Sequence, residues 1–313
     1  MIPLLVISVL LNLSPLLPII GVSSHGARSW VMIFGQQIQP SEFGKITTIL
    51  MMAALVSSRR EILNSVKEYL KCLAILMIPI ASIMLQPDLG TSMVVFVIGL
   101  VILFIGGANR RFLIITLIVI VILVFGILFL DQFLGAKLGR DVLLKQYQVD
   151  RLLVFLNNDR DPGGLGYNLQ QAKISIGSGG LLGQGYMSGT QSSLGFLPEA
   201  PTDFIFCVLA EEFGFLGSLG LLFLYSLLLG LSLRVAMKAD GFGRLIVGGC
   251  MGLWIFQIIQ NIGMTCGLMP ITGIPLPFFS FGSSFMIVNF MAVGLIVSVH
   301  AHKMEQESKR LLA

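Results

Sequence analysis

The chain has 313 residues, of which 55% are hydrophobic and only 12% are charged, and its formal net charge is +4. An average soluble domain carries about 25% charged residues, and a soluble fold of this length could not bury so much apolar surface. This composition excludes a soluble enzyme, a disordered chain and a nucleic-acid-binding domain, so no nucleic acid partner is expected. The apolar runs are long and continuous, whereas the strands of a membrane β-barrel alternate. We therefore expect an all-α integral membrane protein.

A helix needs about 20 residues to cross a hydrocarbon core that is about 30 Å thick. Eight apolar segments are candidate transmembrane helices, and residues 1–313 are predicted to form a single polytopic membrane domain. In chain order the segments are Ile2–Val22, Phe43–Ser57, Leu70–Leu85, Thr91–Gly107, Phe112–Leu130, Phe204–Leu233, Leu245–Met264 and Ser284–His300.

The placement of lysine and arginine predicts the orientation, because short cytoplasmic connections carry an excess of basic residues. Twelve basic residues fall in the connections 58–71, 108–111 and 234–244 and in the C-terminal tail. The short connections on the opposite side contain only Arg28. Both termini are therefore predicted to lie in the cytoplasm, which an even number of spans permits.

The connection 131–203 would then lie on the outer face, and a loop of this length is usually functional or disordered. Its first part, Val142–Leu156, resembles an amphipathic helix that lies on the membrane surface. Its second part is rich in glycine, which allows tight turns and close approach of the backbone to a ligand. A flexible linker is the alternative, but interleaved apolar residues such as Leu181, Leu182 and Tyr186 would need burial. This pattern favours a folded extracytoplasmic cap.

Charged residues in or beside the spans are functional candidates, because ionisable groups are costly in hydrocarbon. Glu42 and Lys45 are three residues apart, so they share a helix face and can form an ion pair. That pair could equally be a structural feature of a helix end at the membrane interface. Asp88 lies at an outer helix break, where it could be functional or could merely cap the following helix.

The densest polar cluster closes the long loop and opens the sixth span, with Glu199, Thr202 and Asp203 followed by Glu211 and Glu212. A helix N-terminus stabilises an ionised carboxylate, so Asp203 could be an N-cap or a reactive group at the outer mouth of this helix. Because the two adjacent glutamates cannot share one helix face, at least one should point into a polar interior.

Residues 270–284 contain three prolines, which exclude a regular helix there. Irregular backbone at membrane depth must be buried in protein or line a water-filled cavity. Irregular, polar and flexible elements thus gather on the outer face. This distribution predicts a reaction or binding site at the outer leaflet but does not specify its chemistry.

Several motifs resemble those of SEDS proteins (shape, elongation, division and sporulation). The longest runs from Gln191 to Phe206 and contains the sequence Pro-Glu-Ala-Pro-Thr-Asp-Phe at 198–204. The other matching segments follow in family order and are Gln39–Phe43, Gln86–Thr91, Ile176–Gly180 and Thr272–Phe278. Segments 147–156, 161–167 and 189–191 look more like the RodA branch than the FtsW cell-division branch.

The resemblance implies a peptidoglycan glycosyltransferase of the bacterial cytoplasmic membrane, which polymerises lipid II into β-1,4-linked glycan strands at the outer face during cell elongation. It also implies a class B penicillin-binding protein, a transpeptidase, as partner within the elongation machinery. The family's essential aspartate corresponds to Asp203, and its helix-borne acid and lysine correspond to Glu42 and Lys45. Asp88, in the segment Gln86–Thr91, and Gln191, the first residue of the longest motif, are further candidates for a supporting or substrate-binding role.

The donor sugar carries an α-linked diphosphate and the product is β-linked, so the reaction inverts the anomeric centre and one base for the incoming hydroxyl can suffice. Charge that builds on the diphosphate calls for cations. The candidates are the loop residues Arg151, Arg160 and Lys173, or a divalent ion such as Mg²⁺ or Mn²⁺. Asp203 could be the base or could help to bind the metal.

Three features depart from the family pattern. The family usually has ten spans, so about two N-terminal helices are predicted to be missing. Pro201 replaces a histidine before Thr202, and Phe281 and Ser283 replace a tyrosine and a glycine. Two alternatives stay open: a flippase or transporter of lipid-linked precursors, and a shortened, inactive scaffold for the transpeptidase. Because the inner halves of the spans carry few polar groups, an outer-face enzyme is favoured over a transporter.

Overall fold

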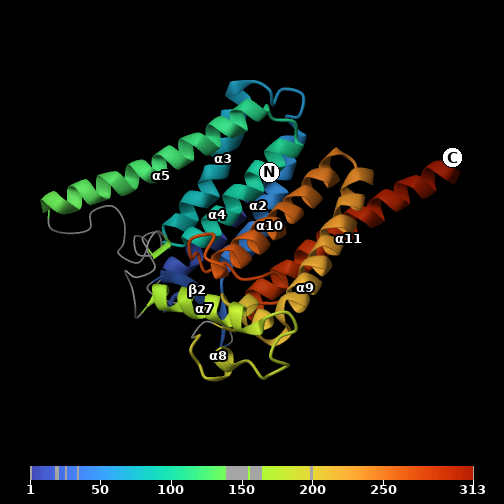
Figure 1. Ribbon diagram of the computed structural model, residues 1–313. Coiled ribbons are helices and arrows are strands. Elements are labelled where there is room, and N and C mark those ends of the chain that lie inside the picture. The colour runs from blue at the N-terminus through green and yellow to red at the C-terminus, as the bar shows by residue number, and fades with distance from the viewer. Residues whose placement is uncertain are drawn as a thin grey trace. The chain divides into compact units, whose positions relative to one another are not determined.

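The computed structural model describes residues 2–17, 21–24, 27–33, 35–138, 154–155, 164–197 and 200–312. Helices dominate these residues (Figure 1), which confirms the predicted helical fold class. Contacts between Cα atoms divide the chain into two compact units. Unit 1 comprises Met1–Asn109, Leu222–Ile258 and Pro277–Ala313, and unit 2 comprises Arg110–Leu221 and Ile259–Leu276.

A helix lies at each of the eight predicted spans. These helices are α1 (Ile2–Leu13), α2 (Pro40–Ser57), α3 (Val66–Met84), α4 (Leu89–Ile105), α5 (Arg110–Leu138), α9 (Ile205–Lys238), α10 (Gly241–Thr265) and α11 (Ser283–Leu312). The predicted outer loop contributes α7 (Leu165–Gly179) and the short α8 (Thr190–Ser193).

Within the described ranges, four helices are long and apolar enough to cross a membrane. They are α5 over Arg110–Asp131, α9, α10, and α11 over Ser283–Lys309. Ile2–Leu16 and Leu89–Ile105 are shorter apolar helical stretches. Protein buries only 6% of the most apolar window of α5 and 17% of that of α9, so most side chains there face outward, as on a lipid-facing helix.

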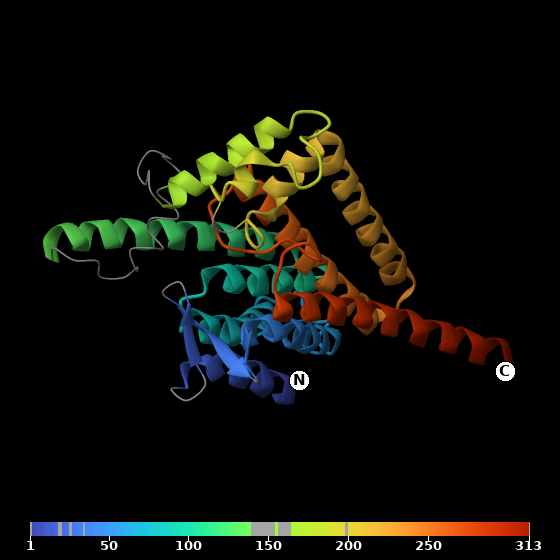
Figure 2. The same ribbon diagram turned by 90° about the horizontal axis from the view of Figure 1, so that it is seen from below.

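The first predicted span is too long, and a small sheet follows it that the sequence did not predict. The helix α1 ends at Leu13, because Pro15 enters a 3₁₀ turn over Ser14–Leu16 (η1) and a proline cannot continue helical hydrogen bonding. The strands β1 (Gly21–Ser24), β2 (Ala27–Ile33) and β3 (Gln36–Ile38) then pair antiparallel in the order β1-β2-β3 (Figure 2). In this register Val22 lies opposite Trp30, and Met32 lies opposite Gln37. Gly21 and Val22 therefore belong to a strand and not to a transmembrane helix.

In unit 1, α2 is the central helix and packs against α1, α3, α4 and α11. Figure 1 shows α2, α3 and α4 side by side. The middle of α2 is fully buried at Ile49, Met51 and Met52. The helices α3 and α4 approach closely at Gly99, where a Cβ atom would lie 2.2 Å from Cδ2 of Leu76. This packing encloses the helix that carries Glu42 and Lys45.

The basic connection 58–71 is ordered by ion pairs. Glu68 accepts hydrogen bonds from Arg59 and from Nζ of Lys71, the latter at 2.6 Å. The hydrogen bond from Lys71 is the largest cause that lowers the pKa of Glu68. This carboxylate therefore stays ionised and offsets part of the positive charge of the connection.

Apolar residues of unit 2 form a buried cluster around the start of α9. The cluster consists of Val154, Leu169, Ala172, Leu197, Phe204, Cys207, Met264 and Ile271. Its members come from the pair 154–155, from α7, from the segment after α8, from the turn before α9 and the first turn of α9, and from the end of α10 and the segment that follows. The described residues 164–197 thus fold onto the start of α9.

The glycine-rich segment after α7 pairs with a break in α9 (Figure 2). Gly214 interrupts the helix with φ 66° and ψ −160°, a conformation that is strained for residues with a side chain. The break frees backbone groups, which form four hydrogen bonds with the segment. They run from Gln184 N to Glu211 O (2.9 Å), from Gly185 N to Glu212 O (3.0 Å), from Phe215 N to Gly180 O (2.9 Å) and from Leu216 N to Leu181 O (3.1 Å).

One expectation for this segment is wrong. Leu181, Leu182 and Tyr186 were expected to be buried, but they are 70%, 78% and 69% exposed. The segment packs on α9 through its backbone, so these side chains are not drawn into the protein core. The amphipathic helix predicted over Val142–Leu156 lies outside the described residues, except for the helical pair Val154 and Phe155.

Candidate active site

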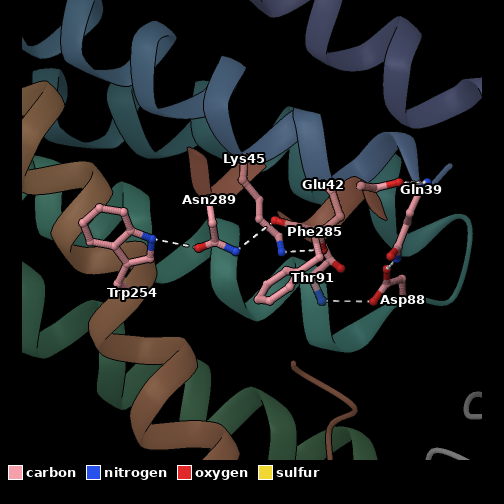
Figure 3. A network of polar contacts seen from close by, with 9 residues as sticks. Gln39, Glu42, Lys45, Asp88, Thr91, Trp254, Phe285 and Asn289 are labelled. Carbon is pink, nitrogen blue, oxygen red and sulfur yellow. Dashed lines mark hydrogen bonds and ion pairs between the residues drawn. The ribbon is translucent and has the colours of Figure 1, made fainter. Parts of the chain in front are cut away.

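The predicted ion pair between Glu42 and Lys45 is formed and is buried near the start of α2 (Figure 3). Nζ of Lys45 lies 2.5 Å from Oε1 of Glu42, and the two side chains are 1% and 4% exposed. The other carboxylate oxygen of Glu42, Oε2, is buried without a hydrogen-bond partner among the described residues. Such a pair depends on both members, because the loss of one leaves an uncompensated buried charge.

Lys45 also contacts an aromatic ring. Its Nζ lies 5.8 Å from the centroid of the Phe285 ring on α11, which is within the range of a cation–π contact. Asn289 donates a hydrogen bond from Nδ2 to the carbonyl oxygen of Phe285 (2.9 Å), and Trp254 on α10 donates from Nε1 to Oδ1 of Asn289 (2.8 Å). A chain of buried contacts therefore connects the ion pair of α2 through α11 to α10 (Figure 3).

Asp88 is the N-cap of α4, as one of its two interpretations predicted. Its Oδ1 accepts a hydrogen bond from the backbone N–H of Thr91 (3.0 Å), and its Oδ2 accepts one from Nε2 of Gln39 (3.0 Å). The backbone N–H of Gln39 donates in turn to Oγ of Ser284 at the start of α11 (3.0 Å). Gln39 therefore joins the beginnings of α2, α4 and α11.

Asp203 lies in unit 2, in the turn directly before α9, and is half-buried. The side chain of Asn261 on α10 holds this turn. Its Nδ2 donates to the carbonyl oxygen of Asp203 (2.9 Å) and to that of Ile274 (2.8 Å). Asn261 is fully buried, and its Oδ1 has no hydrogen-bond partner in the described part of the chain. A single amide thus connects the turn of Asp203 to the irregular segment that follows α10.

Glu211 is fully buried and holds α8 to α9. Its Oε1 accepts hydrogen bonds from the backbone N–H of Gln191 (2.7 Å) and from Oγ1 of Thr190 (3.2 Å). Its Oε2 accepts a hydrogen bond from the backbone N–H of Ser192 (3.2 Å). One of the two adjacent glutamates was expected to point into a polar interior. Glu211 does so, and its polar surroundings are the hydrogen-bond donors of α8.

The remaining predicted residues lie at the edges of this arrangement. The side-chain Oε1 of Gln191 is buried without a hydrogen-bond partner among the described residues, while Thr202 and Glu212 are half-buried. Lys173 is exposed on α7 and lies against Gly267, where a Cβ atom would be 2.3 Å from its Cε. Three predicted residues lie outside the described part of the chain: Arg151, Arg160 and Glu199.

The structure gathers the candidates into two sets, one in each unit. Glu42, Lys45 and Asp88 belong to unit 1, whereas Asp203, Glu211 and Lys173 belong to unit 2. Across the ranges that are described, no three His, Cys, Asp or Glu side chains could hold a metal ion together.

The sequence model of the FtsW, RodA and SpoVE proteins, described as "Cell cycle protein", matches residues 1–305. The chain belongs to this family. One relative, the peptidoglycan glycosyltransferase MrdB of Escherichia coli K12, is 39% identical over 284 residues, which are 90% of this chain and 73% of the relative. Stage V sporulation protein E of Bacillus subtilis 168 is 35% identical over 298 residues, which are 95% of this chain and 77% of the relative.

Solved structures of the family agree with this fold. A chain from a peptidoglycan synthase complex that coordinates polymerisation and crosslinking superimposes with a TM-score of 0.78 at 32% identity, over 96% of this chain and 81% of that chain. RodA of Thermus thermophilus superimposes with a TM-score of 0.66 at 28% identity, over 96% of this chain and 77% of that chain. This SEDS family member is thus a multi-pass bacterial membrane protein, and the resemblance found in its motifs is confirmed.

Uncharged polar residues organise both sets, and they were not among the residues predicted from the sequence. Asn261, Asn289 and Gln39 each bridge two elements through side-chain amides, and Trp254 orients Asn289. A signal was present, because Gln257, Gln260 and Asn261 interrupt an otherwise apolar helix. Because buried amides in an apolar span require hydrogen-bond partners, these three residues indicate contacts with other elements.

Proposed function

We propose that this SEDS protein is a peptidoglycan glycosyltransferase that polymerises lipid II at the outer face of the cytoplasmic membrane, for growth of the cell in length. The observation that carries the proposal is the 39% identity, over 90% of this chain, with a relative named peptidoglycan glycosyltransferase. In the proposed orientation both termini are cytoplasmic, and the turn that contains Asp203 faces outward. The excess of basic residues in the connections 58–71, 108–111 and 234–244 supports this orientation.

In the proposed reaction, the carboxylate of Asp203 accepts the proton from the 4-hydroxyl of the acceptor sugar. The hydroxyl oxygen attacks C1 of the donor sugar, and the bond from C1 to the diphosphate breaks with its electron pair on the diphosphate. The product is β-linked because attack occurs opposite the leaving group. Asn261 supports this step by holding the backbone of Asp203, since a base must lie within hydrogen-bond reach of the proton that it removes.

The leaving diphosphate requires positive charge as its bond breaks. Lys173 is the described candidate, because its basic side chain is exposed on α7 and belongs to the same unit as Asp203. Arg151 and Arg160 are further candidates from the same loop. A divalent cation would supply the same charge stabilisation where the diphosphate completes its coordination.

The proposed partner is a class B penicillin-binding protein of the elongation machinery, which crosslinks the new glycan. The similarity to a chain of a peptidoglycan synthase complex, with a TM-score of 0.78, supports a partner of this kind. Polymerisation by the purified pair tests the proposal. Labelled lipid II is incubated with the complex, with EDTA or with added Mn²⁺, and the glycan is resolved on a gel.

Polymer that forms with the wild-type protein and is lost in Asp203→Ala is the expected result. A difference between the EDTA and Mn²⁺ samples would reveal the metal requirement. Absence of polymer from the wild-type complex would contradict the proposal. In that case, translocation of lipid II in liposomes by both the wild-type protein and Asp203→Ala would identify a flippase. Binding of the transpeptidase without polymerisation or translocation would identify a scaffold.

A further inference from the structure

Four large apolar side chains project from the segment that pairs with the break in α9. Leu181, Leu182, Tyr186 and Met187 are 70%, 78%, 69% and 74% exposed, and we call these four residues the apolar tip. Their exposure follows from the way in which the segment packs. The nitrogen of Gly183 would lie 2.3 Å from a Cβ atom at Gly214, so the two backbones touch without intervening side chains.

The segment around the apolar tip lacks the charges of a water-exposed surface. Residues 174–198 contain no Asp, Glu, Lys, Arg or His, whereas roughly a quarter to a third of a soluble surface consists of charged residues. The tip instead has the composition of a membrane-inserting element, with leucine and methionine beside a tyrosine. Tyrosine is enriched where membrane proteins cross the boundary between lipid and water.

The length of α9 indicates where that boundary lies. From Ile205 to Leu233, the last residue before Arg234, the chain has 29 residues, or about 43 Å of helix, which exceeds a hydrocarbon core of about 30 Å. From Phe215 to Leu233 it has 19 residues, or about 28 Å, which matches the core. The break at Gly214 is therefore expected to coincide with the edge of the hydrocarbon.

The apolar tip is fixed at the depth of this break. Phe215 N donates to Gly180 O at 2.9 Å, and Leu216 N donates to Leu181 O at 3.1 Å. Phe213, Phe215 and Leu216 of α9 are themselves 45%, 55% and 57% exposed. The rings of Tyr186 and Phe213 lie 6.2 Å apart. The tip therefore continues the lipid-facing surface of α9 and is not an isolated patch on a water-exposed cap.

We propose that the apolar tip inserts into the outer leaflet, where lipid acyl chains and the headgroup boundary cover its four side chains. The predicted cap is then partly a membrane element, attached to α9 through backbone hydrogen bonds. The choice of the outer leaflet rests on the orientation given with the proposed function. Insertion into the membrane does not depend on that orientation, because it follows from the length of α9, the exposed side chains and the lack of charges in residues 174–198.

Fluorescence quenching in liposomes tests the insertion of the full-length protein. Leu182→Trp places a reporter in the apolar tip, and Gln170→Trp is the matched control at an exposed polar position of α7. The emission of Trp30 and Trp254 is measured in the wild-type protein and subtracted. Brominated phosphatidylcholine reports contact with lipid, and iodide reports contact with water.

Quenching of the Leu182→Trp signal by brominated lipid but not by iodide is expected, with bromine near the headgroup end of the acyl chain more effective than bromine near its methyl end. The Gln170→Trp signal should show the reverse preference. Quenching of Leu182→Trp by iodide would place the tip in water, and protection from both quenchers would show that protein covers it. Either result would overturn the proposal. The measurement requires no substrate, so it succeeds or fails independently of the polymerase assay.

Discussion

The two units stabilise buried carboxylates in different ways. In unit 1, Glu42 is neutralised by the ammonium group of Lys45 on the same helix. In unit 2, Glu211 is not paired with a cation in the described structure but accepts hydrogen bonds from two backbone N–H groups and a hydroxyl. Asp203 differs from both, because it is half-buried in a turn that is held through its backbone carbonyl. Glu42 and Glu211 are thus fixed by their partners inside the protein, whereas the half-buried Asp203 is the acid that we propose to meet the substrate.

The largest effect is expected for Asp203→Asn, which keeps the size of the side chain and removes the base. Polymerisation should fall by about 10²–10⁴-fold, while Asn261 should still hold the turn through the backbone carbonyl oxygen of residue 203. The measurement is the rate of glycan formation on a gel. Asp240→Asn is the matched control, since Asp240 accepts a hydrogen bond from the N–H of Gly243 at the start of α10 and asparagine caps helices equally well. A comparable loss of activity in the control would refute the special role of Asp203.

The ion pair of unit 1 is expected to control stability. Glu42→Gln or Lys45→Met should each lower the free energy of unfolding by roughly 3–5 kcal/mol, because each leaves a buried charge without its partner. The double variant should be less destabilised than the sum of the two, since neither charge remains. Thermal unfolding in detergent of the wild-type protein, the two single variants and the double variant forms a double-mutant cycle that measures this coupling. Additive losses would show that the two residues act independently.

Asn261→Leu is expected to lower the rate of polymerisation without weakening the binding of substrate. Loss of the amide frees the turn of Asp203, and misplacement of a catalytic group by about 1 Å can cost about 100-fold in rate. The expected result is a fall in kcat with little change in KM. Gln260→Leu is the control, because Gln260 lies on the same helix, is also buried, and donates to the carbonyl oxygen of Pro270 at 2.9 Å. Equal losses of kcat in both variants would show that any disturbance of α10 lowers activity and that Asn261 has no specific role.

The smallest of these effects is expected for Glu211→Gln. Hydrogen bonds to a charged group contribute roughly 1.5–3 kcal/mol, and an amide can accept only through its oxygen, so part of this contribution is lost. Residues 189–193 should then open more often, and limited proteolysis should cut there faster than in the wild-type protein. An unchanged cleavage rate would show that the backbone pairing at Gly214 is sufficient to hold this segment.

The sequence predicts the helices well because long apolar runs have few alternatives in a membrane. It also predicts the absence of regular structure after α10, since Pro270, Pro275 and Pro277 lie close together there. The strand β1 was missed because Gly21 and Val22 were included in the predicted span Ile2–Val22, and no strand was predicted in the short connection that contains β2 and β3.

The sequence predicts the charged residues of the candidate site, but it does not predict the polar contacts that hold them in place. The spacing of Glu42 and Lys45 gives their ion pair directly, because residues three apart share a helix face. The contacts of Asn261 with Asp203 and Ile274 join residues that are distant in the chain, so they depend on the tertiary fold. The burial expected for Leu181 and Leu182 was wrong because an apolar residue of a membrane protein can face lipid as readily as a core.

The most direct test of the central claim is the affinity of Asp203→Asn for lipid II, measured on the purified complex. If Asp203 is the base, the variant should bind lipid II as tightly as the wild-type protein, or more tightly because a negative charge near the diphosphate is gone, and yet should form polymer about 10²–10⁴-fold more slowly. Loss of binding together with activity would contradict the account and would make Asp203 a substrate- or metal-binding residue instead.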